Sequence, residues 1–187
     1  KYFEMRLVIK YGGTSISAAK DIQAIAKHLN SLSKKNQIVV VCSATSGTTD
    51  DLIEISESIK KENKSKAEQL ASKITNRHKQ LAKQTIKKSD IRKKLLKNFD
   101  EDFTELVALI DGMVLLGEVT PRTMDYLFSF GEKLSIKLIS SAINDSGKKS
   151  IPLTGKEVGI VTDSNFGESK PLMDTTRLRV SKTVDAL

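Results

Sequence analysis

Two short apolar runs near the start of the chain, separated by a segment with helical spacing, predict a strand–helix–strand unit. The runs span residues 6–10 and 37–42, and short apolar runs rich in β-branched residues are typical of buried strands. Between them, apolar side chains recur from Ala18 to Leu29 at the spacing of one helix face. Ser17 precedes this segment and is predicted to cap its N-terminus. This order of elements predicts two parallel strands joined by a crossover helix.

The chain beyond the second run is predicted to be largely helical as far as about residue 118. Asp50 and Asp51 suit the N-terminus of a helix, where negative charge is favourable. Residues 63–97 contain no glycine and no proline, and the apolar run at residues 106–116 predicts a buried helix. Pro121 is predicted to mark the break that follows this helix. We therefore expect an α/β fold with a helical excursion over about residues 50–118.

The last third of the chain gives a mixed pattern. Apolar spacing predicts a helix over residues 130–144, which Gly147 would end. Residues 149–153 predict a further short strand, and residues 155–170 predict loops. From Met173 onward the helical pattern is weak.

Composition excludes several classes of protein. The chain has 187 residues, of which 39% are hydrophobic and 29% charged, so it can bury a core. Its single cysteine, Cys42, cannot form an internal disulfide, which favours a reducing cytoplasm and a buried apolar role for this side chain. The two histidines, His28 and His78, are scattered and predict structural or exposed side chains and no zinc site. No apolar run is long enough to span a membrane.

The net charge of +8 has a local origin. Residues 60–97 hold 14 lysines and arginines against 3 acidic residues. Such a basic segment could bind a phosphate backbone, but no aromatic residue lies between Leu52 and Asn98 on which a base could stack. A pair of helices with solvated charged faces is the favoured interpretation, and an anion- or nucleic-acid-binding module is the alternative.

Topology brings two candidate loops to the same place. Ligands of parallel sheets bind at the carboxyl ends of the strands, where we expect residues 11–15, here called the glycine loop. Gly12 and Gly13 allow the backbone to approach a ligand closely, and Lys10 supplies a positive charge suited to phosphate. The chain lacks both common glycine-rich nucleotide motifs. Phosphate binding and a simple tight turn both remain open at this point.

The second candidate is residues 43–49, here called the hydroxyl loop. Five of its seven residues carry a hydroxyl group, and such groups suit a carboxylate or a phosphate. The alternative is that Thr48 or Thr49 caps the following helix.

A third candidate is Glu132. Ser129 and Glu132 have the spacing of a capping box, in which Glu132 would bind the backbone N–H of Ser129. The functional alternative is that Glu132 binds the ammonium group of a substrate.

Four segments taken together resemble one family. They read V-I-K-Y-G-G-T-S at residues 8–15, V-V-V-C-S-A-T-S-G-T-T-D-D-L at 39–52, F-S-F-G-E-K-L-S at 128–135 and L-T-G-K-E-V-G-I-V-T-D-S-N-F-G at 153–167. In this order they resemble the aspartokinases of the amino acid kinase superfamily. The resemblance covers almost the whole chain, and Tyr11 stands where the family usually has phenylalanine.

The resemblance implies a three-layer αβα sandwich of the amino acid kinase type. It also implies transfer of the γ-phosphoryl group of ATP, with Mg²⁺, to the side-chain carboxylate of L-aspartate, the first step towards lysine, threonine and methionine. By motif match, the implied site consists of Lys10 as the catalytic lysine, Gly12, Gly13, Thr14 and Ser15 as the phosphate loop, Ser43 and Thr49 near the substrate, and Glu132 at the aspartate amino group. No side chain is implied as a metal ligand.

The resemblance does not include every segment that is typical of the family. Nothing after Pro171 resembles the family's G-R-G-G-S-D segment, and no ACT regulatory domain follows. We therefore expect residues 1–187 to be the N-terminal portion of a kinase domain, with little turnover alone. A cytoplasmic protein is expected, a homo-oligomer is compatible with the family, and neither a membrane nor nucleic acid is expected as a partner. Another amino acid kinase, acting on glutamate or N-acetylglutamate, is a further alternative.

Overall fold

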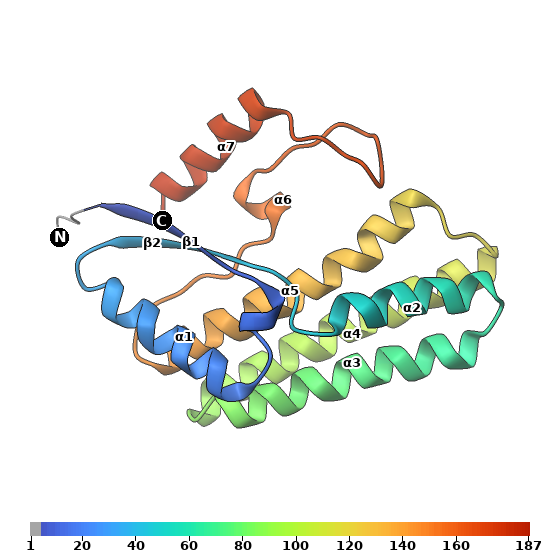
Figure 1. Cartoon of the computed structure of the whole chain (residues 1–187), viewed down its shortest axis with the longest axis horizontal. Coiled ribbons are helices and arrows are strands. Elements are labelled where there is room, and N and C mark those ends of the chain that lie inside the picture. The colour runs from blue at the N-terminus through green and yellow to red at the C-terminus, as the bar shows by residue number, and fades with distance from the viewer. Residues whose placement is uncertain (1–4) are drawn as a thin grey trace.

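A computed structural model describes residues 5–187 of the chain. The strands β1 (Arg6–Tyr11) and β2 (Gln37–Cys42) pair in parallel, with α1 (Ala19–Leu32) between them in the chain, as predicted. Figure 1 shows α1 and α5 on one side of the strands and α7 on the other. The remaining elements are η1 (Gly13–Ser15), α2 (Thr48–Lys60), α3 (Lys64–Thr85), α4 (Ser89–Leu116), α5 (Pro121–Asp145), α6 (Gly155–Val158) and α7 (Met173–Asp185).

The two strands have one packed face and one open face. Ile9 and Tyr11, with their partners in β2, pack against the core. On the opposite face, Val8 is 68% exposed and Val41, which pairs with Lys10, is 45% exposed. The prediction that both strands are buried is therefore correct for one face only. The ion pair between Arg6 and Asp185 joins the end of α7 to β1 at 2.8 Å.

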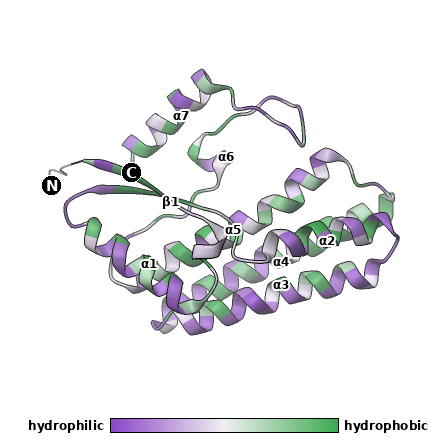
Figure 2. Ribbon diagram, viewed as in Figure 1, coloured by the Kyte–Doolittle hydropathy of each residue, from purple (hydrophilic) through white to green (hydrophobic). Residues whose placement is uncertain are grey.

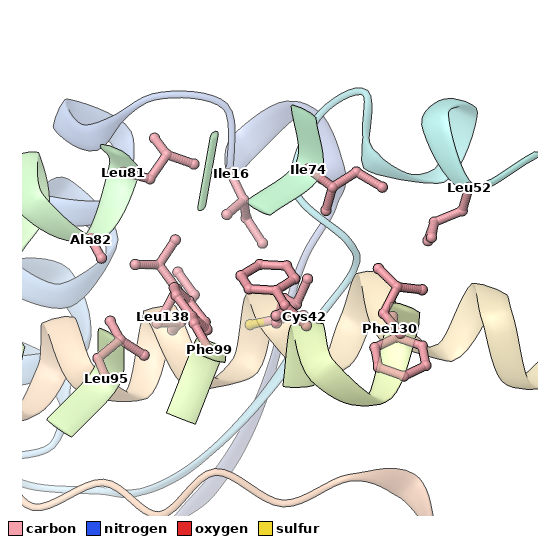
Figure 3. Packing of buried hydrophobic residues seen from close by; sticks show 14 of the residues in the cluster. Ile16, Cys42, Leu52, Ile74, Leu81, Ala82, Leu95, Phe99, Phe130 and Leu138 are labelled. Carbon is pink, nitrogen blue, oxygen red and sulfur yellow. The ribbon is translucent and has the colours of Figure 1, made fainter. Parts of the chain in front are cut away.

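The core lies between α1 and the helices α2–α5. Each of α2–α5 packs against the next one along the chain, and α1 packs against α3 and α5. Hydrophobic and hydrophilic residues alternate along these helices in Figure 2, and the buried side chains of the core are mainly apolar. Figure 3 shows Phe99 of α4 close to Leu138 of α5, both fully buried. The helical excursion predicted over about residues 50–118 is confirmed as α2, α3 and α4.

Several predicted helix ends are wrong. The predicted break after α4 is present, but Pro121 already occupies the first turn of α5, where a missing N–H costs nothing, so the helix predicted over residues 130–144 begins at Pro121. Thr120 caps this helix by accepting the N–H of Thr123 at 3.2 Å. The cap of α1 is Ala18 rather than Ser17, whose hydroxyl instead donates to Asp21 at 2.7 Å.

Two predictions about buried or extended segments also need correction. Residues 149–153 form no strand, because the sheet of the described residues has no further strand for them to pair with. Ser150 instead donates its N–H to the side chain of Asn144 at 2.9 Å. In the run at residues 106–116, Leu115 and Leu116 are 86% and 73% exposed, so only part of that run is buried. Within residues 5–187, no helix combines the length and apolar character that crossing a membrane requires.

Candidate functional site

The hydroxyl loop lies directly against the glycine loop at the carboxyl ends of the two strands. Ser43 donates its N–H to the carbonyl O of Tyr11 at 3.1 Å, and Ser46 donates its N–H to the carbonyl O of Ile16 at 3.3 Å. These bonds continue the parallel pairing of β1 and β2 beyond the sheet. The two loops that the topology brought to one edge are therefore in contact.

Two glycines let the neighbouring backbones approach the hydroxyl loop. A Cβ atom on Gly13 would lie 2.9 Å from the carbonyl O of Ala44, and one on Gly131 would lie 2.7 Å from the Cβ of Ala44. Both distances are shorter than packed side chains tolerate. Gly13 belongs to the glycine loop and Gly131 to α5, so Ala44 is held between two elements that are far apart in the sequence.

We expect Gly131→Ala to destabilise the protein by about 1–3 kcal/mol, because the added methyl group overlaps Ala44 in a packed interior. Gly112→Ala is the matched control. Gly112 also lies inside a helix, but a Cβ atom there meets nothing within 4 Å. The control should be neutral or stabilising by up to about 1 kcal/mol. Urea unfolding of both variants measures the difference, and equal stabilities would contradict the close contact.

Lys10 stands at the end of β1 with its charge unpaired. Its side chain is exposed, and among residues 5–187 no carboxylate lies within ion-pair distance of it. The next residues form η1, whose hydrogen bonds run from Ser15 N–H to the carbonyl of Gly12 and from Ile16 N–H to that of Gly13. The turn itself therefore leaves the N–H groups of Gly13 and Thr14 unused. A free ammonium group and free amides at one sheet edge suit an anion.

The hydroxyl loop divides into accessible and buried hydroxyl groups. Ser43 is half-buried and Thr49 is exposed in the first turn of α2, whereas Thr45 and Thr48 are 2% and 0% exposed. The suggestion that Thr48 or Thr49 caps α2 is wrong, because the N-cap is Gly47 in a left-handed conformation with φ of 74°. Ser43 and Thr49 can therefore reach a ligand, and Thr45 and Thr48 cannot.

Glu132 is exposed on α5 beside the same loop. Its Oε1 atom accepts the backbone N–H of Ala44 at 3.3 Å. The predicted capping box with Ser129 is wrong, since both residues lie inside α5, which begins at Pro121. The carboxylate is thus turned towards the hydroxyl loop and away from its own helix terminus. Two of the site residues inferred from the sequence, Gly13 and Glu132, therefore both lie against Ala44 of the hydroxyl loop.

A buried histidine that contacts the hydroxyl loop was not predicted from the sequence to belong to the site. His78 of α3 is fully buried, and its Nε2 atom lies 3.1 Å from the Oγ1 atom of Thr45. The sequence left open whether His78 is structural or exposed, and it offered no signal for this contact across 33 residues. Burial lowers the pKa of His78 to about 4, mainly because desolvation penalises the charged ring. Burial likewise raises the pKa of Cys42 to about 11, as expected for a packed apolar thiol.

The depressed pKa of His78 predicts acid sensitivity. The unfolded chain protonates this histidine at about pH 6.5 and the folded chain only near the lowered pKa, so stability falls as pH drops through that window. Going from about pH 7 to about pH 4.5, wild type should lose about 2 kcal/mol more stability than His78→Gln. Urea unfolding at both pH values measures this. His28→Gln, which removes an exposed histidine, is the control. A pH dependence equal in wild type and His78→Gln would contradict the prediction.

Many charges of the basic segment at residues 60–97 are paired within the fold. Lys64 binds Asp111 at 2.8 Å and Lys79 binds Asp100 at 2.6 Å, both across to α4. Lys73 and Arg77 bind the buried Asp51 of α2 at 2.8 and 2.5 Å. These contacts support the interpretation of a helical pair with solvated and paired charges. Among residues 5–187, no cluster of three or more histidine, cysteine, aspartate or glutamate side chains is arranged to hold a metal ion.

Comparisons with known proteins all identify similarity to amino acid kinases. Residues 5–183 match the model of the amino acid kinase family. The chain is 30% identical to aspartokinase 1, chloroplastic, of Arabidopsis thaliana over 85% of its own length, and 27% identical to the aspartokinase of Geobacillus stearothermophilus over 92%. In fold it matches the crystal structure of E. coli aspartokinase III in complex with aspartate and ADP, with a TM-score of 0.80 and 19% identity over 98% of the chain.

The matched proteins are considerably longer. This chain spans 27% of the Arabidopsis protein and 29% of the Geobacillus protein. It covers 39% of the E. coli structure. The similarity therefore covers nearly all of this chain and less than half of each of these proteins.

Proposed function

The chain belongs to the amino acid kinase family, and on that premise we propose that it forms the part of an aspartokinase that carries the phosphate loop and part of the aspartate site. One observation carries this proposal. Three motif segments, around Lys10, Ser43 and Glu132, are widely separated in the sequence and meet around Ala44 at the carboxyl ends of the strands. The reaction would transfer the γ-phosphoryl group of ATP to the side-chain carboxylate of L-aspartate.

The residues present suit this chemistry. The side-chain carboxylate of aspartate has a reference pKa of about 3.9, so it is already ionised at neutral pH and needs no general base. The obstacle is the repulsion between an anionic nucleophile and an anionic phosphate. Positive charge and orientation overcome it. Lys10, which is exposed and has no ionic partner among residues 5–187, and the N–H groups of the glycine loop would supply both here.

On the acceptor side, we assign Glu132 to the ammonium group of L-aspartate, and Ser43 and Thr49 to its polar oxygens. Glu132 already accepts one N–H group, that of Ala44, so its carboxylate faces the place where these hydroxyl groups are accessible. An ionised carboxylate forms a strong, charge-assisted hydrogen bond with an ammonium group. This arrangement would hold the side chain of aspartate towards the glycine loop.

The glycine loop has the room that a nucleotide phosphate requires. Gly12 has open space around its Cα, since an added Cβ atom would meet nothing within 4 Å. Thr14 and Ser15 are exposed beside it. A bound ATP–Mg²⁺ would supply the γ-phosphoryl group, and Lys10 with the loop N–H groups would hold it in place. The product, a mixed acid anhydride of aspartate, suits the first step towards lysine, threonine and methionine.

Release of ADP tests this function. We expect ADP release that depends on L-aspartate from the natural polypeptide that contains this chain, and little from residues 1–187 alone. The reason is that the chain spans only 27–32% of the Arabidopsis aspartokinases 1 and 2. A coupled spectrophotometric assay with and without L-aspartate measures both. Faster release with L-glutamate or N-acetyl-L-glutamate would instead favour another amino acid kinase. Normal turnover by residues 1–187 would contradict the expectation for the short chain.

A further inference from the structure

The hydroxyl loop is connected to α2 and α3 by a network of hydrogen bonds in which Thr45, Thr48 and His78 are buried and Arg77 is half-buried. The Oγ1 atoms of Thr45 and Thr48 lie 2.7 Å apart, and Arg77 donates to Thr48 at 3.2 Å. On the other side of Thr45 lies the Nε2 atom of His78, at 3.1 Å. Asp51 in turn fixes Arg77 by an ion pair of 2.5 Å. None of the accessible site residues takes part in this hydrogen-bond network.

The direction of each hydrogen bond in this network follows from the groups at its two ends, the ring of His78 and the guanidinium group of Arg77. The Nδ1 atom of His78 lies 2.9 Å from the carbonyl O of Ile74, which can only accept, so Nδ1 carries the hydrogen. The ring is neutral because burial lowers its pKa to about 4, which leaves Nε2 as an acceptor. Thr45 therefore donates to His78, Thr48 donates to Thr45, and Arg77 donates to Thr48. Both hydroxyl hydrogens are used inside the protein.

The ring of His78 is itself fixed in orientation. It packs edge-on against Phe99, with ring centroids 5.9 Å apart, and against Phe103 at 6.5 Å. Both phenylalanines belong to α4. The position of Thr45 is thus set by three helices of the excursion. Thr45 lies two residues after Ser43 and four before Thr49, the two hydroxyl residues assigned to the substrate.

We propose that His78 is a positioning residue for the aspartate site: from α3, its Nε2 atom fixes Thr45 and thereby sets where Ser43 and Thr49 present their hydroxyl groups. This inference rests on the proposed function for the identity of the ligand. It assigns the helical excursion a role in supporting the site, which the sequence alone does not suggest. His78 touches no substrate and acts only through the loop, so its loss should affect substrate affinity more than the rate of the chemical step.

The direction of the hydrogen bonds can be tested by ¹⁵N NMR of the histidine rings in the 187-residue chain. At neutral pH we expect the ring of His78 to carry its hydrogen on Nδ1 and to accept at Nε2. The exposed His28 provides the reference spectrum of an unconstrained ring. A hydrogen on Nε2 of His78, or a doubly protonated ring at neutral pH, would overturn the proposal.

The positioning role can be tested by hydrogen exchange of the same chain. His78→Phe keeps a ring but removes the acceptor, and Thr45→Val removes the donor, which provides a second variant if the first fails to fold. In either, the backbone amides of Ser46 and Thr48, which donate to the carbonyls of Ile16 and Thr45, should exchange at least about tenfold faster. Leu95→Ala is the matched control, since it loosens the same core at a buried side chain of α4 that is not one of the two rings packed against His78. Unchanged exchange in the loop, or equal acceleration by Leu95→Ala, would overturn the role.

Kinetics of the natural polypeptide separate this proposal from the proposed function. His78→Phe should raise the KM for L-aspartate about tenfold with a smaller change in kcat, and His78→Gln, which restores an acceptor near the same point, should recover much of the loss. If wild type phosphorylates L-aspartate and His78→Phe leaves KM unchanged, the positioning role is wrong. If wild type does not phosphorylate L-aspartate, the proposed function is wrong, and the exchange experiment still decides whether His78 holds the loop.

Discussion

Lys10→Ala is expected to lower kcat for phosphoryl transfer to L-aspartate by roughly 1000-fold or more in the natural polypeptide, equivalent to about 4 kcal/mol of transition-state stabilisation. Lys10 is exposed at the end of β1 and has no acidic partner among residues 5–187, so its charge is available for a phosphate. In the proposed reaction the transferred group and its acceptor are both anionic, and no general base is needed. Removing this charge should therefore affect the chemical step directly.

The same substitution should leave the fold intact. Truncation of an exposed, unpaired side chain changes stability by no more than about 0.5 kcal/mol, which urea unfolding measures. Lys20→Ala, which removes an exposed lysine from α1, is the matched control and should keep the wild-type kcat. A kcat for Lys10→Ala within about threefold of wild type would exclude Lys10 from the transition state.

The second large effect is expected for Glu132→Gln. The amide keeps the shape of the side chain but loses the charge that would bind the ammonium group of L-aspartate. The KM for L-aspartate should rise roughly 10- to 100-fold, the range expected when a charge-assisted hydrogen bond is lost. The KM for ATP should change little, because Glu132 lies beside Ala44 and not in the glycine loop.

A purely structural Glu132 would behave differently. In Glu132→Gln the amide oxygen can still accept the N–H of Ala44, so for a purely structural role stability would fall by less than about 1 kcal/mol and the KM for L-aspartate would not change. Measuring stability and both KM values on the same preparation distinguishes the two roles. Glu101→Gln, which changes an exposed carboxylate of α4, is the matched control for the loss of one negative charge.

The sequence predicted the part of the fold that depends on local pattern. The apolar runs at residues 6–10 and 37–42, with helical spacing between them, were enough to predict a parallel pair with its loops at one edge. That topology alone places the glycine and hydroxyl loops at the same edge of the sheet. The approach of α5 was not predictable in this way, because it depends on Gly131 packing against Ala44, a contact between distant segments.

The wrong predictions have physical reasons. Proline is compatible both with the end of one helix and with the first turn of the next, so Pro121 was ambiguous and the start of α5 was misplaced. A strand needs a neighbour for its backbone hydrogen bonds, and residues 149–153 have none in the described sheet. The five hydroxyl residues of the hydroxyl loop looked alike in sequence, since only the packing of α3 separates the buried Thr45 from the accessible Ser43.

In the proposed function, the site around Ala44 transfers a phosphoryl group to the side-chain carboxylate of L-aspartate. The product of that reaction is an acyl phosphate, which hydroxylamine converts to a stable hydroxamate with release of phosphate. The natural polypeptide that contains this chain, incubated with ATP, Mg²⁺, L-aspartate and hydroxylamine, should form the hydroxamate of the aspartate side chain, identified by mass spectrometry, and Lys10→Ala should form almost none. No hydroxamate from L-aspartate, or a hydroxamate formed only from L-glutamate or N-acetyl-L-glutamate, would contradict the account.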